Sequence, residues 1–342
     1  MLKQILYIIL FLNITLLISA QTLTGIVYDQ NLNEPVWNAN VYFDATSLHT
    51  ITDKEGRFEL KTDKDIAANL VISFVGYEKV IFNPPFTTIP DTIFLKEKPA
   101  ELAEVVVRAK EGGYTRARKL KAFRNQFLGT SKAGKSCKIL NEEDIKLIYD
   151  SRNKVLIASA NMPIIVENKY LGYTIHFDLA EFRVQYNNNS LDDMNMLKTS
   201  ILGTTSYQDI SKKKKKIQEN RRVVYDKSIS NFIRNLYNNT LDKSNFRLLK
   251  GGDWLILEDC FTITKEDESH YKVTIIPRIF ELGDIVIIYD KKQMFSSRMN
   301  FHTNEFWINS SQITAPLNGE ISFSGDMGDQ RIGDLLPTDY KP

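Results

Sequence analysis

Apolar and polar positions alternate over residues 22–107 in the way that short β-strands require. In "RFEL", Phe58 and Leu60 alternate with charged residues, so one face is apolar and the other is polar. Such segments recur roughly every ten residues with turn residues between them, a spacing typical of a β-sandwich. They are "TLTGIVYD", "NVYFDAT", "HTITD", "RFELK", "NLVISFVGYEKVIF", "TIFLKE" and "AEVVVRA". We therefore predict an N-terminal β-sandwich over residues 21–107.

The stretch "TDKEGRFEL" within this region poses a choice between a calcium loop and a turn. With Gly56 as the glycine of an EF-hand, the first ligand falls on Ile51 and the last on Thr62, and neither replaces a carboxylate. With Asp53 as the first ligand, the glycine position falls on Phe58. Because both registers fail, we predict a hairpin turn in which Gly56 supplies a positive φ.

Residues 108–138 differ from the sandwich in charge, with ten Lys or Arg and one Glu. Leu120, Phe123 and Phe127 fall near helical spacing, and most of the charges lie elsewhere around the helix. We predict a basic linker and an amphipathic helix that ends at Gly129. Since an isolated helix this short is barely stable in water, its apolar side should dock on the following domain and leave the charges facing outward.

Residues 139–342 mix strand-like and helix-like patterns. In "SISNFIRNLYNN" the apolar residues Ile229, Phe232, Ile233 and Leu236 share one helical face. The strand-like segments are "KVLIASA", "PIIVENK", "YTIHFDLAEFRVQY", "HYKVTIIPR", "DIVIIYDKK", "MNFHTNEFWIN" and "EISFSGDM". We predict a mixed α+β domain of unknown function here, and a mainly β protein overall.

The first 20 residues have the pattern of a secretory signal peptide. Lys3 precedes an apolar run that ends at the small residue Ala20, so we expect the mature chain to begin near Gln21. An uncleaved membrane anchor is the alternative, but the run is short for a bilayer span. No later stretch is long and apolar enough to cross a membrane, so we expect no transmembrane span after cleavage.

The overall charge of the chain bears on whether it binds nucleic acid. The chain has 342 residues, a formal net charge of +2 and 43% hydrophobic residues, which is ordinary for a globular protein. This length is enough for about two domains with cores of their own. Since no global positive field is present, we expect no nucleic-acid partner.

Cys137 and Cys260 are the only two cysteines. Two thiols make neither a disulfide framework nor a four-thiolate zinc site. In an oxidising compartment they could form one disulfide, and otherwise they are small buried residues. The sequence does not show whether they meet, so both interpretations stay open.

Five N-terminal blocks, "TGIVYD", "NANVYFDAT", "TDKEGRFEL", "LVISFVGYEKV" and "LAEVVV", resemble in order the carboxypeptidase-like regulatory domain. That family is a prealbumin-like sandwich found at the N-termini of Bacteroidetes-type cell-envelope proteins. In carboxypeptidases the module carries no catalytic residues, so the resemblance implies no peptidase activity. Later blocks, including "FLGTSKAGKSCKILN" and "GDQRIGDLLPTDY", resemble uncharacterised secreted proteins with the same module. The resemblance implies an exported protein, periplasmic or associated with the outer membrane.

No catalytic or metal-binding pattern occurs at local spacing. The four histidines, His49, His176, His270 and His302, lack the spacing of a zinc site. "GTSKAGKS", residues 129–136, fits the phosphate-loop pattern letter for letter. However, a phosphate loop needs a buried strand immediately before it, and here a basic helical segment precedes it. We therefore assign no catalytic, cofactor-binding or metal-binding residues and expect no cofactor.

The strongest local charge is the run Lys212–Lys216. We interpret the run as a solvated helix face; because export argues against nucleic acid, the alternative is contact with an anionic lipid head group or an acidic partner. Candidate anionic-surface contacts in the two basic segments are Arg116, Arg118, Lys119, Lys121, Lys212, Lys213, Lys214, Lys215 and Lys216.

Two functions of different classes remain. The first is a non-catalytic accessory or binding protein of the bacterial periplasm or outer membrane, whose partner is an envelope protein or the anionic outer-membrane surface. The alternative is a secreted hydrolase acting on glycan or peptide, with its site in residues 139–342. A deep pocket with two carboxylates, or with a histidine beside one, would favour the hydrolase.

Overall fold

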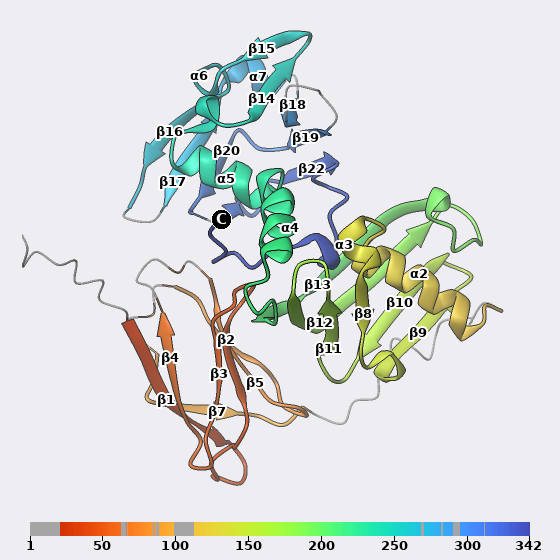
Figure 1. Ribbon diagram of the computed structural model, residues 1–342, viewed down its shortest axis with the longest axis vertical. Helices are drawn as coiled ribbons and strands as arrows, with labels where there is room; N and C mark the ends of the chain where they lie inside the picture. The colour runs from red at the N-terminus through yellow and green to blue at the C-terminus, as the bar shows by residue number, and fades with distance from the viewer. Residues whose placement is uncertain are drawn as a thin grey trace, which may run out of the picture.

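The computed structural model describes residues 21–342 except 63–65, 67, 85, 87–88, 99–112, 268–269, 282, 290–294 and 311. The predicted signal peptide and the predicted strand "AEVVVRA" lie outside the described residues. The chain is mostly β, with sandwich-like sheets first and a mixed α+β region after them, which confirms the predicted fold class. Figure 1 shows the N-terminal strands as a separate body below the rest of the chain.

The N-terminal strands form two sheets that enclose an apolar core. The strands are β1 (Gln21–Asp29), β2 (Asn40–Phe43), β3 (His49–Ile51), β4 (Arg57–Thr62), β5 (Leu70–Ser73), β6 (Val80–Phe82) and β7 (Thr92–Leu95). One sheet has the order β4-β1-β7 and the other β3-β2-β5-β6. In β4 every second residue is buried, Phe58 and Leu60 among them, as the alternating pattern predicted.

The segment "NLVISFVGYEKVIF" is two strands rather than one. All of β5 is buried, and the chain then turns before β6 begins. The Tyr77 N–H donates to the Phe74 carbonyl oxygen (3.1 Å), and the Tyr77 hydroxyl donates to Asp29 of β1 (2.5 Å). Apolar residues continue through this turn because Phe74 packs against the core, so the alternation alone did not show the break.

The "TDKEGRFEL" stretch is a turn, but the hairpin prediction was wrong. Gly56 has φ +73°, and a Cβ there would lie 2.5 Å from the Val27 carbonyl oxygen, so only glycine fits. The Asp53 carboxylate accepts the N–H groups of Glu55 (3.0 Å) and Arg57 (2.8 Å). The turn joins β3 and β4, which belong to different sheets, so the chain crosses here from one layer of the sandwich to the other.

The middle part of the chain is a curved six-stranded sheet covered by one helix. Its elements are α2 (Arg116–Leu128), α3 (Lys132–Lys135), β8 (Cys137–Ile139), η2 (Glu142–Asp144), β9 (Ile145–Asp150), β10 (Val155–Ala160), β11 (Ile164–Asn168), β12 (Tyr173–Tyr186), η3 (Asp193–Asn195) and β13 (Met196–Asp209). The 14-residue strand β12 is central, with β11 and β10 along one edge and β13 along the other. The apolar face of α2, with Phe123 and Phe127, is buried against this sheet.

The last part contains two further sheets and several helices. Its elements are α4 (Lys215–Asp226), α5 (Ile229–Tyr237), η4 (Leu241–Lys243), β14 (Phe246–Lys250), β15 (Asp253–Leu255), α6 (Leu257–Cys260), β16 (Phe261–Lys265), β17 (Tyr271–Ile275), α7 (Pro277–Glu281), β18 (Asp284–Tyr289), β19 (Phe295–Phe301), β20 (Glu305–Ile308), β21 (Ile313–Thr314), β22 (Ile321–Gly325) and η5 (Ile332–Asp334). The sheets have the orders β15-β14-β18-β19-β22 and β16-β17-β20-β21. Helix α5 follows the predicted pattern, with Phe232, Ile233 and Leu236 buried.

The described residues form three separate apolar clusters. One lies inside the sandwich, one between α2 and the β8–β13 sheet, and one among α5 and the two last sheets. Residues 139–342 therefore contain two cores, and the first of them also includes α2 and Ile332 of the C-terminal segment. Figure 1 shows α4 and α5 near the centre of the molecule, with the C-terminus beside them.

Candidate functional site

The basic side chains of α2 make contacts within the protein. Arg116 donates to the carbonyl oxygens of Glu142 (2.7 Å) and Ile145 (2.9 Å), and Arg124 forms an ion pair with the Glu142 carboxylate. These contacts join α2 to the start of β9, so the two arginines hold the helix on the sheet.

The other candidate residues of α2 differ in their surroundings. Arg118 lies 3.7 Å from the Asp192 carboxylate and 5.0 Å from the centre of the Tyr114 ring. Lys119 is only 6% exposed, so it is not available to an external surface, contrary to the prediction. Lys121 is exposed. The structure thus leaves Lys121 in solvent, whereas Arg116 and Arg118 already have partners.

The run Lys212–Lys216 has a different environment. All five lysines are exposed, and they lie together where the chain leaves β13 and enters α4. Lys212 and Lys213 have positive φ angles of 50° and 55°, so the chain makes a tight turn before Lys214 caps the helix. Lys216 lies 3.6 Å from Glu219 in an exposed pair, an interaction that contributes little in water.

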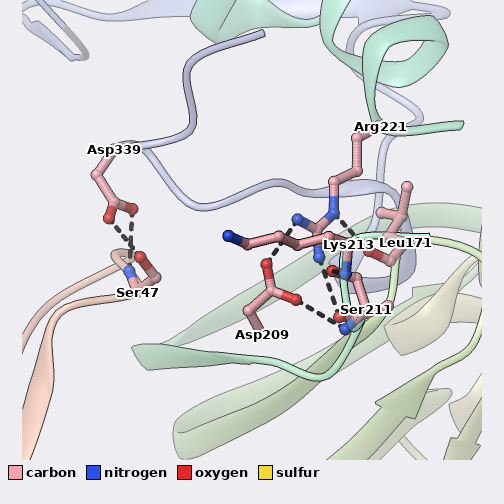
Figure 2. A network of polar contacts seen from close by, with 8 residues as sticks. Ser47, Leu171, Asp209, Ser211, Lys213, Arg221 and Asp339 are labelled. Carbon is pink, nitrogen blue, oxygen red and sulfur yellow. Dashed lines mark hydrogen bonds and ion pairs between the residues drawn. The ribbon is translucent and has the colours of Figure 1, made fainter. Parts of the chain in front are cut away.

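A buried arginine fixes the position of this lysine run. Arg221 of α4 is 3% exposed and donates to the carbonyl oxygens of Leu171 (2.7 Å) and Gly172 (3.0 Å) and to the Asp209 carboxylate (2.8 Å). Figure 2 shows these bonds converging on its guanidinium group, which also lies 3.8 Å from the centre of the Tyr173 ring. The arginine joins α4 to both ends of the β12–β13 hairpin.

The electrostatics of Asp209 follow from this arrangement. Burial opposes ionisation of the carboxyl group, but hydrogen bonds from Arg221 and Ser211 outweigh it and lower the pKa of Asp209 to about 2. The Ser211 N–H donates to this carboxylate at 2.7 Å, at the start of the turn that carries the lysines. An ionised Asp209 therefore stabilises both the turn and the helix that follows.

Gly172 allows α4 to lie close to the β11–β12 turn. Its φ is +67°, and a Cβ would lie 2.9 Å from Cγ2 of Ile217 and 3.0 Å from Ser211. A side chain at this position would strain the backbone and push the first turn of α4 outward. The close approach lets Arg221 reach the carbonyl oxygens of the turn.

Both cysteines are free thiols in the described part of the chain, so the bridge that the sequence left open is not formed. Cys137 packs beside the core of the β8–β13 sheet, and Cys260 is buried in the last core. Burial raises the pKa of each thiol to about 12, which keeps both protonated at neutral pH. Two protonated thiols in different cores are structural residues.

The segment "GTSKAGKS" does not have the surroundings of a phosphate loop. Helix α2 precedes it, and the helix within it, α3, has only four residues. The Ser131 hydroxyl accepts the Gly134 N–H (2.9 Å) and donates to the Asp334 carboxylate. The loop therefore packs against the C-terminal segment and binds a carboxylate of the protein itself.

A small pocket lies near titratable groups. A pocket of about 70 Å³ lies between α4, α5 and the C-terminal segment, and Tyr225, Arg234, Asp334 and Tyr340 are among its lining residues. Substrate pockets are usually several hundred Å³ in volume. Burial raises the pKa of Asp334, but no second carboxylate or histidine lines this space. Among the described residues, no group of three or more His, Cys, Asp or Glu could hold a metal ion.

Sequence reasoning missed the residues that position the lysines. Neither Arg221 nor Asp209 was singled out from the sequence. The one local signal was Gly172 in "NKYLGYTI", because a glycine beside large aromatic residues indicates a turn or a close approach. Burial of an arginine by its partners is a long-range property that no local pattern reports.

The comparison with protein families concerns the N-terminal sandwich. The CarboxypepD_reg-like domain family matches residues 23–107. No curated protein matches the chain. Among the described residues, no helix has both the length and the apolar character needed to cross a bilayer.

Two solved structures show weak similarity. A 9R-lipoxygenase from Cyanothece PCC8801 is 12% identical with a TM-score of 0.19, and the match covers 60% of this chain. This chain spans 44% of the length of that lipoxygenase. A protein of unknown function from Bacteroides fragilis NCTC 9343 is 11% identical with a TM-score of 0.17, over 86% of this chain and 98% of that one. At these TM-scores neither structure defines the fold or the function of this chain.

Proposed function

We propose that this chain is an exported, non-catalytic binding protein of the bacterial cell envelope that contacts an anionic surface through Lys212–Lys216. The signal-peptide pattern of residues 1–20 supports export to the periplasm or the outer membrane. The regulatory-type sandwich at 23–107 belongs to a class of domain that is generally non-catalytic. The resemblance to Bacteroidetes-type envelope proteins supports the same location.

The observation that carries the proposal is the exposure of five consecutive lysines at one rigid position. Arg221 holds α4 by three bonds, so the run is presented on an ordered element. In the described part of the chain, Lys216 of this run pairs with one acidic neighbour, Glu219. The positive end of the α4 dipole adds to the field of the lysines.

The expected strength of this contact is modest and depends on salt. Each Lys near an anionic surface contributes about 1 kcal/mol at low ionic strength. The attraction decays over a Debye length of roughly 10 Å at 0.1 M salt. Five lysines therefore suffice for reversible attachment to a surface rich in phosphate groups.

The test is co-sedimentation of the mature protein with anionic and with neutral vesicles. We expect binding to anionic vesicles only, and binding at least about tenfold weaker when Lys212–Lys216 are all changed to Gln. The matched control carries the same change in charge at scattered exposed positions, namely Lys54→Gln, Lys61→Gln, Lys98→Gln, Lys169→Gln and Lys265→Gln. If both variants lose the same amount of binding to anionic vesicles, or if the protein binds anionic and neutral vesicles equally, the proposal is wrong and the run is a solvated helix face.

A further inference from the structure

The C-terminal segment binds the body of the protein through α5. Arg234 donates from its two terminal nitrogens to the carbonyl oxygens of Thr338 (3.2 Å) and Tyr340 (3.2 Å). The Tyr340 ring also meets the Tyr225 ring of α4 edge-on, with centres 5.6 Å apart. The Arg234 side chain thus binds the backbone of the C-terminal segment at two residues.

The same segment binds the N-terminal sandwich from its other side. The Thr338 N–H donates to the Ala45 carbonyl oxygen (2.7 Å). The Asp339 carboxylate accepts both the N–H (2.9 Å) and the hydroxyl group (2.5 Å) of Ser47, as Figure 2 shows. The last residues of the chain therefore link α5 to the loop after β2.

This loop is also paired with the edge of β13. The Ala45 N–H donates to the Thr205 carbonyl oxygen (2.7 Å), and the Tyr207 N–H donates to the Thr46 carbonyl oxygen (3.0 Å). These two bonds form a short parallel bridge. This loop of the sandwich is thus contacted by β13 on one side and by the C-terminal segment on the other.

The attachment of the sandwich is polar. Besides the loop, Lys79 forms an ion pair with Asp178 of β12 (3.0 Å), and the Tyr42 hydroxyl bonds the Thr204 hydroxyl (2.8 Å). The apolar cluster of the sandwich contains residues of the sandwich alone. Contacts between bodies with separate cores, made of hydrogen bonds and ion pairs, are the kind that open and close without unfolding.

The packing beneath the segment is also incomplete. The pocket of about 70 Å³ lies between residues 334–340 on one side and Tyr225 and Arg234 on the other. The segment is therefore held by a few hydrogen bonds, and its side chains do not fill the pocket beneath it.

We propose that residues 335–340 form a latch that holds the sandwich against the rest of the protein, and that its release frees the sandwich to move. Release removes the Asp339–Ser47 and Thr338–Ala45 bonds together. Among the described residues, the sandwich then keeps the bonds of its loop to β13, the Lys79–Asp178 pair and the Tyr42–Thr204 bond. The backbone groups of Thr205 and Tyr207 on the β13 edge then open more often. The device couples the position of the N-terminal domain to contacts made by the C-terminal end of the chain.

The test is hydrogen exchange of the full chain, followed at residues 44–48 and 204–208. In Asp339→Ala we expect exchange there about tenfold faster, because two hydrogen bonds to Ser47 are lost. Ser47→Ala keeps the N–H bond and should give a smaller increase. Lys341→Ala, an exposed position in the same segment, is the matched control and should change nothing.

A second variant separates the latch from a general loss of stability. A chain that lacks residues 338–342 should show the same local acceleration and a larger radius of gyration in solution scattering, with β5 of the sandwich core exchanging as before. Equal acceleration in β5 would mean unfolding and would overturn the proposal. Unchanged exchange at 44–48 in both variants would overturn it as well.

Discussion

The two basic segments of this protein look alike in sequence and differ in structure. In α2, Arg116 and Arg124 bond to the chain around Glu142, and Lys119 is buried. In the run Lys212–Lys216, every side chain is exposed. A count of charges does not distinguish a helix that uses arginines to dock from a turn that presents lysines to solvent.

The physical reason lies in what each segment faces. Arginine offers five donors in a planar fork and therefore suits the carbonyl oxygens and carboxylates around a helix that packs on a sheet. Lysine is a strongly hydrated point charge, and at the N-terminus of α4 it meets a positive helix end rather than an acceptor. Arg116 and Arg124 of α2 therefore bond within the protein, and the lysines of the run remain available for a partner.

The largest expected change in the free energy of unfolding tests the docking of α2 on the sheet. Phe123 is fully buried between α2 and the sheet, and its ring lies 4.7 Å from that of Phe182. Phe123→Ala should lower the free energy of unfolding by about 3–5 kcal/mol, because it leaves a cavity. Denaturant unfolding measures this. Lys121→Ala, exposed on the same helix, should stay within about 0.5 kcal/mol, and a similar loss there would contradict the assigned faces.

The next effect tests the anchor of α4. Arg221→Met keeps much of the side-chain volume but removes the guanidinium that donates to the Leu171 and Gly172 carbonyl oxygens and to Asp209. Gly172 keeps the Ile210 N–H as a donor (2.9 Å). The free energy of unfolding should fall by about 2–3 kcal/mol. Arg222→Met, at the exposed neighbouring position, is the control. If the free energy of unfolding falls equally little in both variants, Arg221 does not fix the position of the lysine run.

A smaller effect is expected with pH. The pKa of Asp209 falls from 3.8 to about 2 in the folded protein, so its contribution to stability is present above 3.8 and is lost as pH falls towards 2. The side chain is 47% exposed, so the effect should be smaller than that of Arg221→Met. We expect the stability difference between the natural protein and Asp209→Asn to shrink over this interval. A constant difference across acid titration would show that Asp209 does not titrate with folding.

The smallest effect compares the two segments directly. Changing Arg116 and Arg124 together to Gln should lower the free energy of unfolding by about 1 kcal/mol, since the ion pair of Arg124 is partly exposed. Changing Lys212–Lys216 to Gln should alter the free energy of unfolding by no more than about 0.5 kcal/mol. Thermal and denaturant unfolding of the two variants give this comparison. A larger loss from the lysines would mean that they have a structural role.

Regular elements with a strong local period were predictable. Strand β12 matches the segment "YTIHFDLAEFRVQY" from end to end, and α5 matches the apolar spacing around Phe232. Strand β13, equally long, was missed, because Lys198, Thr204 and Gly203 interrupt its apolar pattern. It forms because β12 offers a complete edge for pairing, and that edge is set by tertiary structure.

The sequence by itself determined the sandwich, the position of α2, the Gly56 turn and the clustering of charge, because each depends on neighbouring residues in the chain. Only the tertiary structure decided which charges are used inside the protein. It also placed Cys137 and Cys260 in different cores and brought Asp339 to Ser47. Contacts of this kind join residues far apart in sequence, and they depend on how separately formed surfaces meet, which local periodicity does not encode.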